Sequence, residues 1–368
     1  MKSILLMTKE NKIEVGVFII LIVGVLGFYP SSLSVRLVKQ IMLEWAVIAF
    51  VALFFIKPFW MKLFLLWSLT LTIWNYTQSK EIAKASYFTT MTVFFSFIVF
   101  QVIYCKIKDR KVIYKILDFF CIVTIIQLTM MYLQMFGVWL FFTPKLELTH
   151  SSYIVGFLDN TNTSGIFLAL MLPAFFRKNW YYIIPFIIVA LVKTHCFAAI
   201  LSLVAGVSFY LWFILKSYRI SIFSILILLA VIYFLKYEGF EKLLTFNKRI
   251  PLWKAVFNEL IPIHWVHGWG PGQFRVIVSK AKKAYVHNEY LQLWLEYGVI
   301  GVGIVLGYIT SLFTKIYKHK TYLSTILFTA ILIGLINAFV NFYMHLTAGI
   351  IMIIYFVLFE KETEYAKT

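Results

Sequence analysis

Charged side chains are scarce in this chain of 368 residues. They make up 14% of the sequence, whereas hydrophobic residues make up 62%. A soluble domain of this length does not need so much apolar surface. Alternating strand patterns are also missing, and the apolar runs are too long for the strands of a membrane barrel. The chain is therefore expected to be an all-α integral membrane protein.

The apolar runs have the length of membrane helices. Such a helix needs about 20 mostly apolar residues, and about twelve segments approach this rule, some of them short. No small-residue cleavage site follows the first segment, so it is expected to be retained. No internal repeat, low-complexity tract or soluble domain is found, so residues 1–368 are expected to form one polytopic membrane domain. The predicted spans are 14–30, 39–56, 59–75, 86–105, 116–136, 161–176, 179–192, 196–215, 220–235, 297–314, 321–342 and 346–359.

Acidic residues are fewer than basic ones. The chain has 16 Asp and Glu against 34 Lys and Arg, which gives a net charge of +18. Most basic residues fall in alternate loops, so the positive-inside rule places both termini in the cytoplasm. One long outer loop, about 236–296, keeps a net positive charge and favours an anionic ligand. No soluble basic face with interleaved aromatic residues is found, so nucleic acid is not expected as a partner.

Cysteine is nearly absent. Cys105, Cys121 and Cys196 are odd in number and dispersed, so they predict neither a disulfide framework nor a metal site. His264 and His267 are three residues apart and could share a metal on a helix. Pro262 and the glycines that follow argue against a helix there, so no metal site is expected.

The outer loop 236–296 is long enough to hold structure of its own. Residues 251–260 have the pattern of an amphipathic helix, with Pro251 suited to the first turn and Pro262 to the end. Such a helix is expected to lie on the membrane surface or to cap the bundle. The sequence Gly268-Trp269-Gly270-Pro271-Gly272 predicts a tight, irregular turn.

Polar residues gather where this loop meets the next apolar segment. The sequence His287-Asn288-Glu289-Tyr290-Leu291 is followed by Glu296, Gly298 and Gly301. Histidine is the side chain that titrates nearest neutral pH, so His287 is a candidate general base. Glu296 is expected to brace the start of the following span rather than to take part in chemistry.

Three motifs in this order resemble a known family. They are Arg249-x-x-x-Trp253, then Gly268-x-Gly270-x-Gly272-x-Phe274, then His287-Asn288-x-x-Leu291-x-x-x-x-Glu296-x-Gly298-x-x-Gly301. The set resembles the carboxy-terminal region of the O-antigen ligase and Wzy-type O-antigen polymerase superfamily. Its members are bacterial inner-membrane glycosyltransferases with many helices and one large periplasmic loop late in the chain. The match covers about residues 245–302, and the rest of the chain only in outline.

The resemblance implies a reaction at the periplasmic face. A glycan would pass from an undecaprenyl diphosphate carrier to a hydroxyl group of a lipid or glycan acceptor, as in lipopolysaccharide biosynthesis, without a metal or cofactor. His287 would act as catalytic base, and Arg249 and Arg275 would bind the diphosphate. Asn288 is a further candidate for substrate binding. The protein would lie in the bacterial inner membrane, in contact with membrane lipids.

Two upstream segments also resemble the family. In Gly156-Phe157-Leu158-Asp159-Asn160-Thr161-Asn162, Asn162 stands at the matching position, although Asn160 or Thr161 could simply cap a helix. Between predicted spans seven and eight, Lys193 and His195 are further candidates for substrate binding. The family usually has a Ser-Arg pair here, whereas this chain has His195-Cys196, and lysine cannot offer the bidentate fork of arginine.

Three alternatives remain beside this interpretation. A glycosyltransferase class that uses acidic residues in its first outer loop is disfavoured, because the loop around Ser31 to Arg36 has none. A transporter or flippase for lipid-linked glycans usually has ionisable residues in mid-span, whereas Glu44 and Asp118 lie near span ends. A non-catalytic binder of the same glycolipid is compatible with the missing Ser-Arg pair. The sequence does not separate ligase from polymerase.

Overall fold

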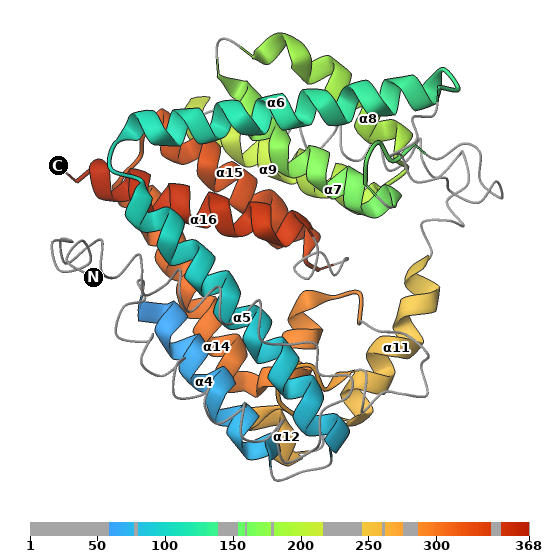
Figure 1. The fold of residues 1–368 in the computed structure, drawn as a ribbon, viewed down its shortest axis with the longest axis vertical. Helices are drawn as coiled ribbons and strands as arrows, with labels where there is room; N and C mark the ends of the chain where they lie inside the picture. The colour runs from blue at the N-terminus through green and yellow to red at the C-terminus, as the bar shows by residue number, and fades with distance from the viewer. Residues whose placement is uncertain are drawn as a thin grey trace, which may run out of the picture. The chain divides into compact units, whose positions relative to one another are not determined.

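The computed structural model describes most of the chain after residue 58, with gaps. The described ranges are 59–76, 80–138, 154–158, 160–177, 180–215, 245–259, 262–274, 286–339 and 347–367. These residues contain helices and turns and no strand (Figure 1). They divide into two compact units. The first contains described residues of 59–106, 256–274 and 293–309, and the second those of 107–255, 286–292 and 310–367.

The first unit is built on a pair of long helices, α4 (Phe59–Tyr76) and α5 (Lys80–Lys106), which pack against each other. Buried hydroxyls join them, because Thr72 Oγ1 and Thr90 Oγ1 lie 2.6 Å apart. The short helix α12 (Pro262–His267) and the central part of α14 (Glu289–Lys318) complete the unit. The indole of Trp67 donates to the carbonyl of Tyr297 at 2.8 Å and so fixes α4 to α14.

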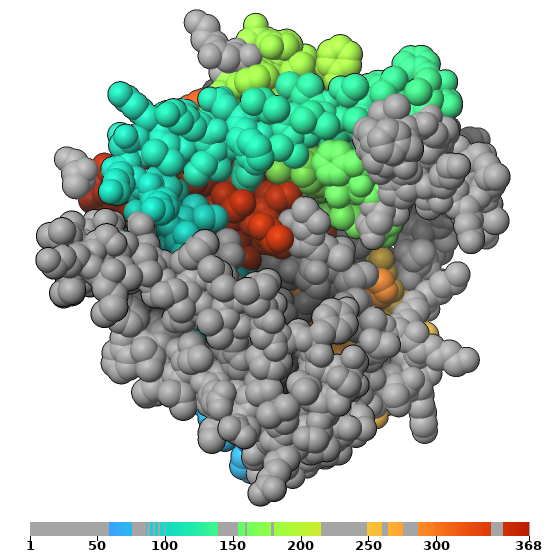
Figure 2. Space-filling model, in the orientation of Figure 1, coloured from blue at the N-terminus to red at the C-terminus, as the bar shows by residue number. Residues whose placement is uncertain are grey.

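The second unit contains most of the remaining helices. They are α6 (Arg110–Met135), α7 (Thr161–Met171), η3 (Leu172–Phe176), η4 (Tyr181–Ile183), α8 (Ile184–Lys193), α9 (Phe197–Leu215), α15 (Tyr322–Asn337) and α16 (Thr347–Tyr365). Helix α11 (Thr245–Glu259) contributes its first residues to this unit, and α14 contributes both its ends. In the space-filling view α6 forms an exposed ridge, with part of α16 visible beside it (Figure 2).

Helices α9 and α15 form the core of the second unit and run antiparallel. Asn337 Nδ2 donates to Ser202 Oγ at 3.4 Å, and Phe209 and Phe328 pack with ring centroids 5.3 Å apart. A Cβ atom on Gly206 would lie 2.3 Å from Cγ1 of Ile333, so glycine permits the close approach of the two helices. The start of α9 therefore lies beside the end of α15, and the end of α9 beside the start of α15.

Helices occupy all the predicted spans that fall within the described residues. Three of these helices are long and apolar enough to cross a membrane: α6, residues 197–214 of α9, and α14. The predicted spans 14–30, 39–56 and 220–235 lie outside the described residues. Several helices begin earlier in the chain than the spans predicted within them, since α5 begins at Lys80 and α14 at Glu289.

One of the two predictions about prolines in the outer loop was wrong. Helix α11 begins at Thr245, so Pro251 lies inside it and not in its first turn. Helix α11 ends at Glu259, before Pro262 as predicted, and Pro262 is also the first residue of α12. Proline suits that position, since the first N–H groups of a helix have no partner within it. The expectation that no helix holds His264 and His267 was therefore also wrong.

Candidate active site

The segment that carries His287 is attached to α11 on one side. The indole of Trp253 donates a hydrogen bond to the carbonyl of Val286, with a distance of 3.1 Å. Val286 is fully buried, and it directly precedes His287. Arg249 lies four residues before Trp253 and so on the same face of α11, with Cβ atoms about 6 Å apart. The first and third motifs of the sequence are thereby brought together.

The start of α14 fixes the backbone around His287. Asn288 is the N-cap, and its side-chain oxygen accepts hydrogen bonds from the backbone of Tyr290 and Leu291, both at 3.0 Å. Asn288 is 8% exposed, and its side-chain oxygen serves the helix and not solvent. His287 is half-buried and has a φ of +56°, which lies in the left-handed region. The cap therefore determines the direction in which the imidazole leaves the backbone.

The end of α15 holds the same segment from the other side. The backbone N–H of Glu289 donates to the carbonyl of Ala338 at 2.9 Å, and the hydroxyl of Tyr290 donates to the carbonyl of Leu335 at 2.8 Å. Because α15 ends beside the start of α9, His287 belongs to the same end of the second unit as the turn before α9. We call this the site end of the second unit.

The turn before α9 carries two predicted residues on its surface. Lys193 and His195 are exposed, whereas Thr194 and Cys196 are buried. His195 has a φ of +53°. His195 and His287 are the non-glycine residues with positive φ in the described part of the chain. Such a backbone is sparsely populated outside glycine, although histidine tolerates it better than most residues.

The same turn is packed tightly against the start of α7. The thiol of Cys196 donates to the carbonyl of Asn162 at 3.9 Å. A Cβ atom on Gly165 would lie 2.4 Å from the Cβ of Cys196, so only glycine allows this approach. Asn160 caps α7 by accepting from the backbone of Thr163 at 2.8 Å, as its position in the sequence predicted. Asn162 itself is exposed in the first turn of α7.

Arg249 is linked electrostatically to this turn. Burial lowers the pKa of its half-buried guanidinium, and an electrostatic interaction with Cys196 acts in the opposite direction. Arginine stays protonated at any physiological pH. Partial desolvation strengthens its attraction for an anion. Arg249, His287, Asn288, Asn162, Lys193 and His195 therefore belong to one end of the second unit, whereas Arg275 lies outside the described residues.

Two glutamines of α6 anchor the loop that leads to α7. Gln134 accepts from the backbone of Val155 and Gly156 at 3.0 and 2.9 Å and donates to the carbonyl of Gly156 at 3.0 Å. Gln127 donates to the carbonyl of Val155 at 2.8 Å. Neither glutamine was among the candidates predicted from the sequence. The sequence feature that could have identified them is a pair of amide side chains seven residues apart, on one face of an apolar span.

The glycines of the second and third motifs have a structural role in the first unit. Gly298 has a φ of +65° and breaks α14, so two carbonyls lose their partners within the helix. Trp269 and Gly270 donate their backbone N–H groups to these carbonyls, of Leu295 and Glu296, both at 2.8 Å. The predicted tight turn is confirmed, because Gly268, Gly270 and Gly272 all have positive φ. Glu296 is 3% exposed, and its backbone carbonyl accepts the bond from Gly270 in this turn.

The two histidines of α12 serve the same turn. The Nδ1 atoms of His264 and His267 lie 3.3 and 2.6 Å from the carbonyl oxygen of Gly268. The ring of His264 stacks on Trp269 with centroids 3.6 Å apart, and desolvation lowers the pKa of this histidine. Within the described ranges, no group of three or more His, Cys, Asp or Glu residues has a geometry that could hold a metal ion.

The comparisons with known proteins agree with the resemblance found in the sequence. The family model for O-antigen ligase matches residues 182–306, a range that contains Lys193, His195, Arg249, His287 and Asn288. The resemblance to the O-antigen ligase superfamily is thereby confirmed. The search among curated proteins gave no match. The family match and the apolar helices indicate a bacterial membrane protein with a glycosyltransferase-like role in polysaccharide assembly.

Proposed function

We propose that this chain, whose residues 182–306 match the O-antigen ligase family, transfers a glycan from undecaprenyl diphosphate to a hydroxyl acceptor. The transfer would take place at the site end of the second unit, on the periplasmic side of the bacterial inner membrane. Ligation onto a lipid anchor and polymerisation of repeat units share this step, and the proposal concerns the shared step.

The proposed reaction is a single substitution at the anomeric carbon of the donor sugar. His287 takes the proton of the acceptor hydroxyl, whose oxygen then attacks that carbon. The bond from the same carbon to the diphosphate oxygen breaks, and undecaprenyl diphosphate leaves with the electron pair. Arg249 stabilises the negative charge of the leaving group. As the family resemblance implies, no metal or cofactor is required.

One observation carries the proposal: the partly desolvated Arg249 is held by α11 beside the segment of His287. The hydrogen bond from Trp253 to Val286 makes this connection. Cys196 also affects the pKa of Arg249, so the turn of Lys193 and His195 lies near the same arginine. A base and a half-buried cation close to exposed polar residues are what a sugar diphosphate donor needs.

Replacement of His287 tests the catalytic role. Asparagine tolerates the left-handed backbone at position 287 but cannot act as a base at neutral pH. We expect His287→Asn to lower glycan transfer at least about a hundredfold. The measurement is release of undecaprenyl diphosphate and growth of the acceptor glycan with purified protein and a lipid-diphosphate glycan.

The control for this test is Lys254→Gln, an exposed position on α11. It is expected to retain normal transfer, and both variants are expected to reach the membrane at wild-type levels. Full transfer by His287→Asn would refute the role of His287 as base. Binding of the glycolipid without release of the carrier, by the wild-type protein, would favour a transporter or a non-catalytic binder instead.

A further inference from the structure

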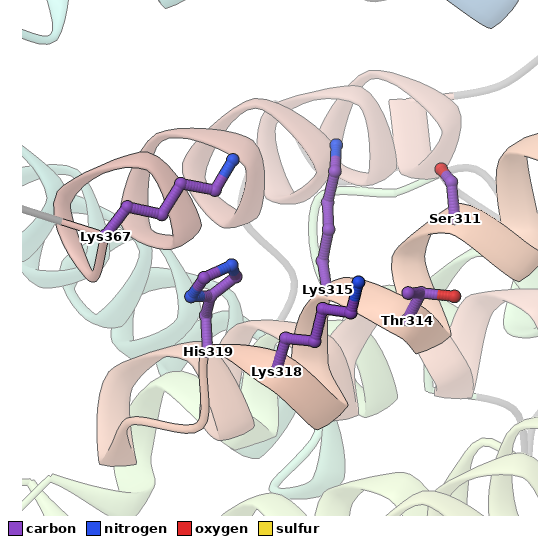
Figure 3. Close-up of a pocket in the computed structure, with 6 residues that line it drawn as sticks. All are labelled: Ser311, Thr314, Lys315, Lys318, His319 and Lys367. Atoms are coloured by element: carbon purple, nitrogen blue, oxygen red, sulfur yellow. The ribbon is translucent and has the colours of Figure 1, made fainter.

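A pocket of about 480 Å³ lies at the end of the second unit remote from the site end. Figure 3 shows the residues that line it. Residues near the end of α14 line most of it, and Lys367 comes from the turn after α16. The lining contains three lysines and no carboxylate: Ser311, Thr314, Lys315, Lys318, His319 and Lys367. The electrostatic character of the pocket is therefore basic, and an anion is the ligand that fits it.

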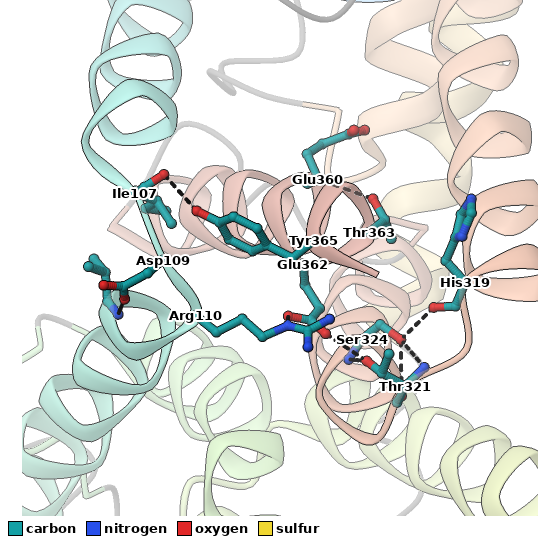
Figure 4. A network of polar contacts seen from close by, with 11 residues as sticks. Ile107, Asp109, Arg110, His319, Thr321, Ser324, Glu360, Glu362, Thr363 and Tyr365 are labelled. Carbon is teal, nitrogen blue, oxygen red and sulfur yellow. Dashed lines mark hydrogen bonds and ion pairs between the residues drawn. The ribbon is translucent and has the colours of Figure 1, made fainter. Parts of the chain in front are cut away.

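Among the described residues, the glutamates of α16 neutralise one of the three pocket lysines, Lys315, whereas the other two glutamates pair with cations outside the pocket lining. Glu362 is 1% exposed and also accepts a hydrogen bond from Thr321 at 2.9 Å, within the polar network at this end of the unit (Figure 4). The three glutamates near the end of α16 are Glu360, Glu362 and Glu364, and each has its own basic partner. The ion pairs are Lys315–Glu360, Arg110–Glu362 and Lys361–Glu364.

Lys318 and Lys367 are the cations that this network leaves for a ligand. Both are exposed, and neither forms an ion pair with a residue in the described ranges. Ser311 and Thr314 line the same pocket, but the hydroxyl of Thr314 already donates to the carbonyl of Thr310 at 3.0 Å, so the two lysines carry the attraction for an anion. Two ammonium groups in one pocket suit a phosphate group, which lysine binds as a point charge.

The dipole of α14 offers a simpler reason for lysines at this position. Cations near the end of a helix interact favourably with the last carbonyl groups. That interaction explains Lys315 and Lys318, which lie in the last turns of α14. It does not explain Lys367, which lines the same pocket from the turn after α16. The pocket therefore indicates more than a stabilised helix end.

We propose that this pocket binds the phosphate group of an anionic phospholipid. Helix α14 is long and apolar enough to cross a membrane, so its end is expected to lie at the depth of the lipid headgroups. The basic loops predict that this end faces the cytoplasm, where the leaflet is rich in anionic lipids. A lipid bound in the pocket would hold the carboxy-terminal end of α14 at the membrane surface, remote from the proposed site of glycan transfer.

The test compares lipid binding by the full protein and by paired variants. In Lys318→Gln/Lys367→Gln, both pocket cations are removed. In the control Lys111→Gln/Lys115→Gln, two exposed lysines of α6 at the same end are removed, with the same change in net charge. Binding of phosphatidylglycerol and phosphatidylcholine is measured by native mass spectrometry of the purified proteins, with titration of each lipid.

We expect phosphatidylglycerol to bind the pocket variant roughly thirtyfold more weakly, since each lysine near a membrane surface contributes about a factor of five. The control should stay within about twofold of the wild-type protein, and phosphatidylcholine should bind weakly to all three. Equal losses in both double variants, or equal binding of the two lipids, would overturn the proposal. Competition by millimolar inorganic phosphate would identify a free phosphate compound as the ligand and reject the lipid.

Discussion

His195 and His287 share a left-handed backbone that few residues other than glycine adopt, and both lie at the site end of the second unit. Backbone strain of this kind costs about 1–3 kcal/mol and persists where the surrounding structure enforces it. At His287 the enforcing contacts come from the Asn288 cap and from the carbonyl of Ala338. The backbone around this imidazole is therefore preorganised, as a base that must meet an incoming hydroxyl requires.

Arg249 allows a test of how the donor diphosphate is bound. Lysine keeps the charge but loses the bidentate fork, whereas glutamine loses both. We expect transfer to fall about tenfold in Arg249→Lys, which corresponds to one charge-assisted hydrogen bond, and about a hundredfold in Arg249→Gln. The measurement is the rate of carrier release by the two Arg249 variants, with Lys254→Gln as the control. If Arg249→Lys were fully active, the arginine would instead interact with lipid headgroups.

Helix α14 is interrupted at a position where only glycine fits. A Cβ atom on Gly298 would lie 2.2 Å from the carbonyl oxygen of Val266, and its φ is +65°. We expect Gly298→Ala to destabilise the protein by at least about 2 kcal/mol. Gly303 is the matched control, because it lies in the same helix and a Cβ atom added there would have no neighbour within 4 Å. Gly303→Ala should be neutral or stabilise by up to about 1 kcal/mol.

Thermal denaturation in detergent checks this pair of variants. A clearly lower midpoint for Gly298→Ala alone is the expected result. Similar midpoints for both alanine variants would mean that the break in α14 is not enforced by the turn at Gly268–Gly270.

Helix α6 determines the shape of the loop before α7 through one buried side chain. Gln134 makes three hydrogen bonds to the backbone of residues 155 and 156 and is 6% exposed. Gln134→Leu leaves those backbone groups buried without partners, and we expect a loss of about 2–3 kcal/mol. Thr129→Val, at an exposed position of the same helix, should change stability by less than about 0.5 kcal/mol. Denaturation midpoints that do not differ would show that the loop finds other partners.

Local patterns predicted one helix cap and one tight turn, but not the distant partners of buried side chains. Asn160 was recognised as a cap and Gly268–Gly272 as a turn, because both depend on a few neighbouring residues. The partners of Gln127 and Gln134 lie 21 to 30 residues away, and periodicity carries no information about them. The start of α11 was missed because the local rule places proline in the first turn, whereas the helix tolerates Pro251 in its interior.

The polar segments of the second unit gather at its two opposite ends. The segments predicted to face the periplasm, around residues 160, 193 and 287, lie together. Arg110, Glu362 and Thr321, from segments predicted to face the cytoplasm, bond to one another at the other end. Opposite ends of α15 carry the two groups, and its 16 residues span about 24 Å. Charge in the sequence therefore predicted which loops belong together.

Sidedness can be tested by cysteine labelling in intact cells. In a Cys105→Ser background, which removes the exposed native thiol, we expect a membrane-impermeant maleimide to label Lys193→Cys from outside. Lys111→Cys should be labelled only after permeabilisation, because it lies at the predicted cytoplasmic end. The inverse pattern would reverse the orientation and move the proposed transfer site to the cytoplasm.

The antiparallel packing of α9 and α15 also has a consequence for combined variants. It separates the pocket of Lys318 from the segment of His287 by the length of α15, so no side chain is shared between them. Free-energy effects of substitutions this far apart usually sum. Lys318→Gln should therefore weaken lipid binding equally in the wild-type protein and in His287→Asn. Each end of the second unit can then serve as an internal control for substitutions at the other end.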